Sequence, residues 1–241
     1  MTKELYWHDS YQKKCQSKVV SLASEKLVVM DQTVFYPQGG GQPTDTGVLR
    51  RGNEEFKVVF TKKVGPDIAL EVDKLGLKEG DSVETELDWS RRYKLMRMHT
   101  SAHILAKVIF DETGSLITGN QLGENESRMD FNVIEFNAGI AQGYRDRANK
   151  VIRENLEVTA SIMPFAEAMK KPELFRLKDV LPKTIPELRV VSIGTFDVQA
   201  DGGTHVRLTG EIGALSLVRI ENKGKENRRI YWSLAQKIMC D

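Results

Sequence analysis

The sequence lacks several features that would each indicate a class of protein. It contains no apolar run near the roughly 18 residues that a membrane-spanning helix requires, and its first residues show no signal peptide. Cysteine is scarce: Cys15 and Cys240 stand far apart with no partner at metal-ligand spacing, so we expect reduced thiols without a disulfide. The net charge is only +1, so bulk charge does not indicate a nucleic-acid partner. We therefore expect a cytoplasmic protein with no membrane partner.

One stretch of the sequence is nevertheless basic. From Trp89 to Lys107 every charged residue is positive, namely Arg91, Arg92, Lys94, Arg97 and Lys107. Such a stretch attracts phosphate groups at long range, which would suit RNA. The alternative is a solvated helix face that binds nothing.

The first ninety or so residues read as all-β. Short runs of β-branched and apolar residues alternate with turn residues and show no helical period, which predicts a small barrel. The expected strands are 18–23, 26–30, 47–51, 56–62, 68–72 and 82–87.

The pattern then changes to helices mixed with strands. We expect helices from Asp88 or Ser90 to Phe110, from Asn137 to near Leu156, and from Pro164 to Lys171. Strands are expected at 128–133, 188–193, 215–222 and 229–235, the last two as a hairpin. Without strict βαβ alternation, this predicts an α+β fold: a small N-terminal β-barrel at 1–89, then an antiparallel α+β two-layer domain at 90–241.

Two short motifs contain three of the four histidines. His99-Thr-Ser-Ala-His103 lies in the expected long helix, where the i, i+4 spacing places both imidazoles on one face and allows them to bind one metal ion. The alternative is a pair of buried histidines bonded to backbone or acids. Because Thr100 follows His99, the general base of a His-Glu-x-x-His peptidase is missing.

The second motif is Asp201-Gly-Gly-Thr-His205. Its two glycines allow a sharp turn that brings Asp201 and His205 together. Three imidazoles and one carboxylate suit zinc, Zn²⁺, and even three histidines alone leave a position for a water molecule. Asp201 could bind the metal directly, hold a ligand histidine or the water, or merely cap the turn.

A third signal is the glycine-rich segment Phe-Tyr-Pro-Gln-Gly-Gly-Gly-Gln-Pro-Thr-Asp at 35–45. Its exposed backbone amides could bind a phosphate or a ribose, and the residues concerned are Gly39, Gly40, Gly41 and Gln42. The segment is neither a P-loop nor a dinucleotide fingerprint, and an ordinary barrel loop is the alternative.

Together, these motifs and the Thr-Gly-Glu-Ile-Gly run at 209–213 resemble, in order, the alanyl-tRNA editing family. That family comprises the editing domains of alanyl-tRNA synthetases and the free-standing AlaX proteins, and the glycine-rich segment is similar to the motif of the medium-length AlaX form. The resemblance implies an ATP-independent hydrolase that deacylates tRNA(Ala) carrying serine or glycine. It also implies zinc held by His99, His103 and His205, with Asp201 where the family has cysteine. A carboxylate is a harder and weaker zinc ligand than a thiolate.

An editing enzyme must destroy the serine ester and spare the smaller alanine ester, so it needs a polar group that binds the serine hydroxyl. The resemblance favours Thr118 for this role, with Gln121 second. Both could instead be polar residues of an ordinary turn. Arg91, Arg92 and Arg97 are expected to hold the tRNA acceptor stem. Two alternatives remain: a non-catalytic tRNA- or synthetase-binding module with a degenerate metal site, and a metal-dependent hydrolase of another small ester or amide.

Overall fold

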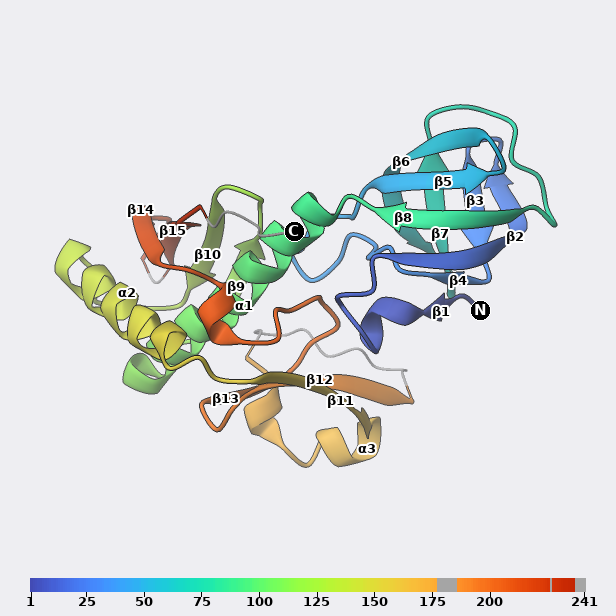
Figure 1. The fold of residues 1–241 in the computed structure, drawn as a ribbon. Helices are drawn as coiled ribbons and strands as arrows, with labels where there is room; N and C mark the ends of the chain where they lie inside the picture. The colour runs from blue at the N-terminus through green and yellow to red at the C-terminus, as the bar shows by residue number, and fades with distance from the viewer. Residues whose placement is uncertain (177–185, 226, 237–241) are drawn as a thin grey trace. The chain divides into compact units, whose positions relative to one another are not determined.

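The computed structural model describes residues 1–176, 186–225 and 227–236, so Cys240 lies outside the described residues. Two compact units divide the chain, Met1–Leu95 and Met96–Asp241, and Figure 1 shows the elements of each. The first unit is a closed antiparallel barrel, and the second combines helices with antiparallel sheets. The α+β prediction is confirmed.

Six strands close the barrel in the order β2-β3-β7-β6-β5-β8. Their bounds are β2 (Lys14–Ser24), β3 (Leu27–Met30), β5 (Gly47–Arg51), β6 (Glu54–Val64), β7 (Asp67–Val72) and β8 (Ser82–Leu87). Each corresponds to one of the six expected strands. The short strands β1 (Lys3–Glu4) and β4 (Gln32–Thr33) pair in parallel beside the 3₁₀ helix η1 (Leu5–Trp7).

Alternation of buried and exposed residues explains the barrel. Along β8, Val83, Thr85 and Leu87 are buried and the residues between them are more exposed. Inward-facing side chains such as Val19 and Phe56 form one apolar cluster that fills the interior. Burial of this apolar surface stabilises the barrel.

The second unit contains two sheets. The four-stranded sheet has the order β14-β15-β10-β9 and the three-stranded sheet the order β11-β12-β13. The bounds are β9 (Ile117–Gln121), β10 (Ser127–Phe131), β11 (Val158–Pro164), β12 (Glu187–Ile193), β13 (Asp197–Ala200), β14 (Leu215–Asn222) and β15 (Arg228–Leu234). The β14–β15 hairpin was predicted, whereas β9, β11 and β13 were not.

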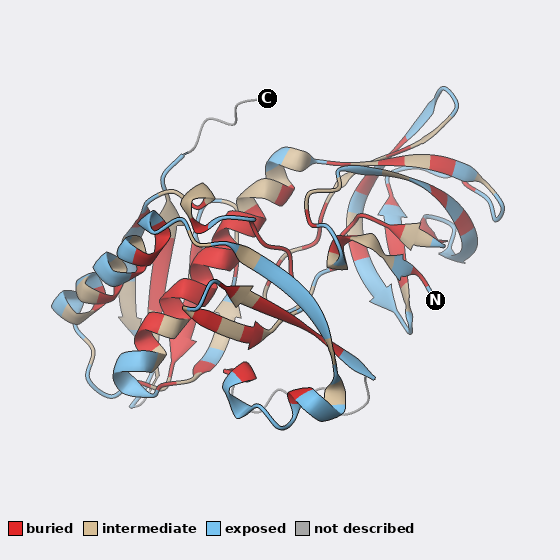
Figure 2. Ribbon diagram, turned by 60° about the horizontal axis from the view of Figure 1, so that its bottom comes forward, coloured by how far each residue is buried: buried red, intermediate tan, exposed pale blue. Residues whose placement is uncertain are grey.

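Helix α1 (Trp89–Thr113) begins in the first unit and continues into the second. Every residue from Met96 to Ala106 is buried, polar ones included (Figure 2). Ser101 Oγ accepts a hydrogen bond of 2.9 Å from Trp232 Nε1, so α1 lies against the buried face of β15. A helix buried on all sides is a core helix, so the alternative of a solvated basic face is wrong for this part of α1.

Two further helices lie in the second unit. Asn137 caps α2 (Ala138–Arg153), and Asn149 bonds both backbone groups of Leu215, which holds α2 against β14. Helix α3 (Phe165–Ala168) starts after Pro164 as expected but ends before Lys171. The remaining 3₁₀ helices are η2 (Pro172–Leu174) and η3 (Thr209–Glu211). None of the helices among the described residues has the length and apolar character needed to cross a membrane.

Candidate metal centre

Helix α1 presents two of the histidines. His99 and His103 lie one turn apart, with ring centroids 5.1 Å from each other, and only 3% and 8% of their surfaces are exposed. Their burial in a core helix fixes both rings with little loss of side-chain freedom on binding a ligand.

The turn after β13 supplies the other two residues, Asp201 and His205. Gly203 N donates to Asp201 Oδ2 (2.7 Å), which closes the turn on itself. Arg189 of β12 anchors the turn, because its Nη1 donates to Asp201 O (3.2 Å) and Gly203 O (2.8 Å) and its carbonyl accepts from Asp201 N (3.0 Å). No pattern in the sequence indicates Arg189, whose contacts arise from the pairing of β12 with β13.

The four side chains converge. Their ligand atoms all lie within 4.8 Å of one another, and His205 stacks near His99 with ring centroids 4.5 Å apart. Asp201 Oδ1 lies 3.4 Å from His99 Nε2 and 3.8 Å from His103 Nε2, and Asp201 Oδ2 lies 2.8 Å from His205 Nε2. Two ligands about 2.1 Å from one tetrahedral ion stand roughly 3.4 Å apart, so the separations of Asp201 Oδ1 from His99 and His103 fit a single zinc-sized cation.

Electrostatics also favours a cation. Burial alone would raise the pKa of the Asp201 carboxyl, but the charge of His99 and hydrogen bonds from all three histidines hold that pKa well below its ordinary value. Burial, followed by the charge of His99, lowers the pKa of His205 well below its ordinary value. An ionised carboxylate beside a neutral imidazole is the donor chemistry that divalent metals bind.

Thr100 orients His205. The Thr100 hydroxyl donates its proton to Met96 O (3.0 Å), so its oxygen accepts from His205 Nδ1 (3.1 Å) and from Val206 N (3.3 Å). Nε2 of His205 then lies 2.8 Å from Asp201 Oδ2 and is the nitrogen that would bind a metal ion through its lone pair. Hydrogen bonds of this kind fix the tautomer and the ring orientation of a metal-binding histidine. In the sequence alone, Thr100 marks only the position where a His-Glu-x-x-His peptidase has its general base.

The two residues expected to recognise serine lie on β9. Thr118 is exposed and donates to Asn227 Oδ1 (3.1 Å). The pairing of β9 with β10 shifts register there, because Asp130 pairs with Gly119 and Phe131 pairs with Ile117, which leaves Thr118 as the extra residue of a bulge. Bulges often redirect a side chain beside an active site.

Gln121 is placed differently. It pairs with Arg128, whose Nε donates to Gln121 Oε1 (3.1 Å), and Arg128 in turn pairs with Tyr231. Successive strand residues face opposite sides, and Trp232 faces α1. Gln121 therefore lies on the side of the sheet away from α1 and its histidines.

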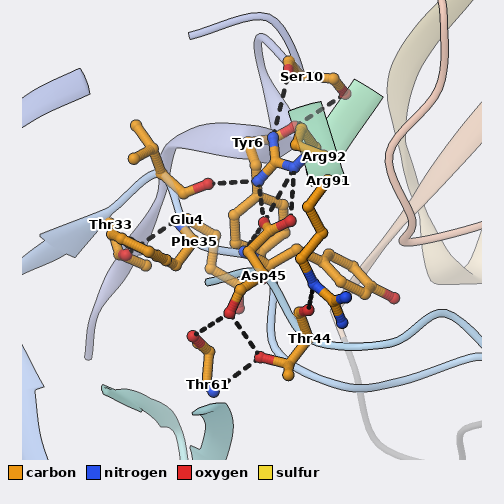
Figure 3. Close-up of polar contacts among 12 residues, drawn as sticks. Glu4, Tyr6, Ser10, Thr33, Phe35, Thr44, Asp45, Thr61, Arg91 and Arg92 are labelled. Carbon is orange, nitrogen blue, oxygen red and sulfur yellow. Dashed lines mark hydrogen bonds and ion pairs between the residues drawn. The ribbon is translucent and has the colours of Figure 1, made fainter. Parts of the chain in front are cut away.

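The basic residues expected to bind tRNA are mostly buried. Arg92 has no exposed surface and Arg97 has 6%. The guanidinium of Arg97 donates to Ile212 O (2.9 and 2.6 Å) and Ala235 O (2.6 Å), which ties α1 to two other segments of its unit. The guanidinium of each arginine is thus occupied by partners within the protein. Arg91 is half-buried, with Nε donating to Thr44 O (3.0 Å) (Figure 3).

The glycine-rich segment forms a loop of the first unit. Gly40 is exposed, Gly39 and Gly41 are half-buried, and Gln42 is fully buried. The backbone of the three glycines therefore reaches the surface, whereas the Gln42 side chain, expected to contact tRNA, points into the protein.

Comparisons with known proteins match both units. Residues 188–231 match the family model described as threonyl and alanyl tRNA synthetase second additional domain, and residues 7–91 match the model for class II (A) tRNA synthetases. Two proteins named alanyl-tRNA editing protein AlaX-M are similar over 97% of this chain and 99% of their own. They come from Methanosarcina barkeri (42% identical) and Methanosarcina acetivorans (43%). An alanine–tRNA ligase from Pyrobaculum aerophilum is 40% identical over 91% of this chain but only 25% of the ligase.

Proposed function

The chain belongs to the AlaX-M family of alanyl-tRNA editing proteins, and from this premise we propose that it hydrolyses the aminoacyl ester of tRNA(Ala) mischarged with serine. In this reaction the bond between the serine carbonyl carbon and the ribose oxygen breaks. Water supplies a hydroxyl to the carbonyl carbon and a proton to the ribose oxygen, which releases serine and free tRNA.

The observation that carries the proposal is the convergence of His99, His103, Asp201 and His205 within 4.8 Å. These residues would hold a zinc ion. When bound, such an ion polarises an ester carbonyl or lowers the pKa of a water molecule toward neutrality. Thr100 keeps the His205 lone pair directed at the cluster, and Arg189 keeps the Asp201 turn in place.

The surface beside Asp201 is open to a substrate. A Cβ atom added at Gly202 would meet no atom within 4 Å, and Gly202 is exposed. The Asp201 side chain itself is 15% exposed, so the otherwise buried cluster has access to solvent on this side. An ester group could approach the cluster there.

The experiment that tests this function is deacylation of seryl-, glycyl- and alanyl-tRNA(Ala) with and without a chelator. We expect rapid release of serine, slow release of alanine, loss of activity with the chelator and recovery with added zinc. Glycine release decides whether the site also accepts glycyl-tRNA. A protein that binds tRNA(Ala) but releases no serine with zinc present would be a non-catalytic binding module.

For selectivity, we propose that Thr118 binds the serine hydroxyl, because its side chain is exposed at a bulge while Gln121 bonds Arg128 on the far side of the sheet. Replacing Thr118 by valine preserves shape and removes the hydrogen bond. The preference for seryl- over alanyl-tRNA should then fall by about 1–3 kcal/mol. An unchanged ratio of the two rates would exclude Thr118 from this role.

A further inference from the structure

The glycine-rich loop, Tyr36–Asp45, is closed by hydrogen bonds at its base and near its tip. At the base, Asp45 N donates to Tyr36 O (3.0 Å) and Tyr36 N donates to Asp45 Oδ2 (2.6 Å). Nearer the tip, Gly39 and Gln42 exchange two backbone hydrogen bonds of 3.1 and 2.8 Å. The loop is therefore a narrow hairpin closed by two pairs of hydrogen bonds.

The tip of this hairpin requires glycine. Gly40 and Gly41 have φ values of 58° and 86°, the left-handed conformation that a two-residue type I′ turn needs at both positions. Tyr36 Oη donates to Gly39 O (3.1 Å), which ties the tip back to the base. The exposed backbone at the tip is thus held in one conformation by bonds within the loop.

Arg92, in the first turns of α1, fastens the base of the loop to the rest of the unit (Figure 3). Its Nε donates to both carboxylate oxygens of Asp45 (3.0 and 2.9 Å), and its Nη2 also bonds Asp45 Oδ2. The same guanidinium donates to Val34 O (2.6 Å), just before the loop, and to Ser10 O (2.9 Å). One buried side chain therefore joins the segments entering and leaving the loop to the N-terminal segment.

A second set of contacts holds the outgoing arm. Thr44 Oγ1 accepts from Thr61 N (2.7 Å) and donates to Asp45 O (3.0 Å), and Thr61 Oγ1 donates to the same carbonyl (3.3 Å). On the incoming arm, Gln38 N donates to Thr61 O (3.1 Å). Strand β6, which carries Thr61, is thus hydrogen-bonded to both arms of the loop.

This network is more extensive than the barrel needs. The apolar cluster closes the barrel, while the Arg92–Asp45 pair lies at the loop base, with 0% and 1% of the two residues exposed. Burying such a pair costs desolvation energy, and apolar residues of similar volume can often replace it without loss of stability. What apolar residues could not supply is the set of directed hydrogen bonds that fixes the loop.

We propose that Arg92 and Asp45 are positioning residues, which hold the glycine-rich loop in the conformation that binds the tRNA acceptor end. Arg92 acts through Asp45 and the loop backbone and does not touch RNA. This inference rests on the proposed function, because it names the binding element of the same reaction. A preorganised loop binds with less loss of conformational freedom than one ordered on contact.

The test compares wild type with Asp45→Asn, which keeps the shape and an acceptor oxygen but removes the charge that pairs with Arg92. We expect faster amide hydrogen exchange at 36–45, weaker binding of uncharged tRNA(Ala), and a KM for seryl-tRNA raised by roughly 10–100-fold. The kcat should change less than twofold, and bound zinc should be unchanged. Gly40→Val should also raise KM, because it removes the turn conformation at the tip.

The matched control is Arg50→Gln, which breaks a partly exposed barrel ion pair between Arg50 and Glu86 and should leave KM and RNA affinity unchanged. If Asp45→Asn does not fold, Arg92→Lys keeps the charge, loses the paired donors and should show the same KM effect. Unchanged KM and RNA affinity in a folded variant with a loosened loop would overturn the inference. Wild-type protein that binds tRNA(Ala) but releases no serine would count against the proposed function instead.

Discussion

Two aspartates, one in each unit, have opposite surroundings. Asp45 is 1% exposed and faces the guanidinium of Arg92, a permanent positive charge supplied by the chain. The Asp201 side chain is 15% exposed and faces three imidazoles, of which His205 has a pKa lowered by burial. The first carboxylate is paired with a guanidinium, whereas the second is surrounded by imidazoles, which are the commonest metal ligands. An aspartate of the second kind is suited to a metal ion, and one of the first kind to holding a loop.

The space around the two aspartates differs in the same way. At Gly47, two residues from Asp45, an added Cβ atom would lie 2.1 Å from Glu86 O and 2.9 Å from Phe35 Cε1. At Gly202, next to Asp201, it would meet nothing within 4 Å. Gly47, near Asp45, is therefore closely packed, whereas Gly202, beside Asp201, faces open space.

The largest expected effect comes from removing one metal-binding imidazole. His103→Ala should abolish seryl-tRNA deacylation and lower bound zinc, while α1 keeps its apolar contacts and the fold survives. Zinc per chain, deacylation rate and circular dichroism measure these three outcomes. His8→Ala is the control, because His8 is the histidine outside the cluster and is exposed. Full activity in His103→Ala would remove the catalytic role from the Asp201 cluster.

The contrast in packing predicts a difference in stability. Gly47→Ala should lower the free energy of unfolding by about 1–3 kcal/mol, because a backbone carbonyl must move to admit the methyl group. Gly202→Ala should change it by less than about 0.5 kcal/mol. Denaturant unfolding of both variants measures the difference. If Gly202→Ala were destabilised and Gly47→Ala were not, the close packing would lie beside Asp201 and not beside Asp45.

A smaller effect is expected from Thr100, which orients His205. Thr100→Val loses the acceptor for His205 Nδ1, so zinc affinity should fall by about 10–100-fold with the cluster otherwise intact. Thr100→Ser restores the hydroxyl and should restore most of the affinity. Competition with a zinc chelator measures it, and identical affinity in Thr100→Val would show that His205 is oriented by Asp201 alone.

Local patterns made much of the fold predictable. The six barrel strands alternate and are separated by turn residues, and the helical spacing of α1 and the cap of α2 stand in continuous sequence. Strand β9, Ile-Thr-Gly-Asn-Gln, reads as a turn because it is polar and lies at a sheet edge. Strand β11 is mostly exposed and β13 has only four residues. These strands depend on partners distant in the sequence more than on their own composition.

In the candidate site too, local motifs were predictable and contacts between distant residues were not. The His-x-x-x-His and Asp-Gly-Gly-Thr-His motifs are local, and the structure brings their ligand atoms together. The burial of Arg92 could not be predicted from the sequence, because its partner Asp45 lies 47 positions earlier in the chain. The bond from His205 to Thr100 likewise spans 105 positions. A basic helix reads as solvated when the partners that bury its charges lie elsewhere in the sequence.

Zinc titration of metal-free protein measures whether Asp201 and the three histidines together bind a metal ion. We expect one zinc per chain in wild type, weaker affinity in Asp201→Ala, and affinity at least as tight as wild type in Asp201→Cys, since thiolate is the softer ligand. If cysteine failed to restore the affinity, Asp201 would act by holding a ligand histidine. Absence of saturable zinc binding in wild type would exclude a metal site at these residues, and equal affinity in wild type and Asp201→Ala would exclude Asp201 from it.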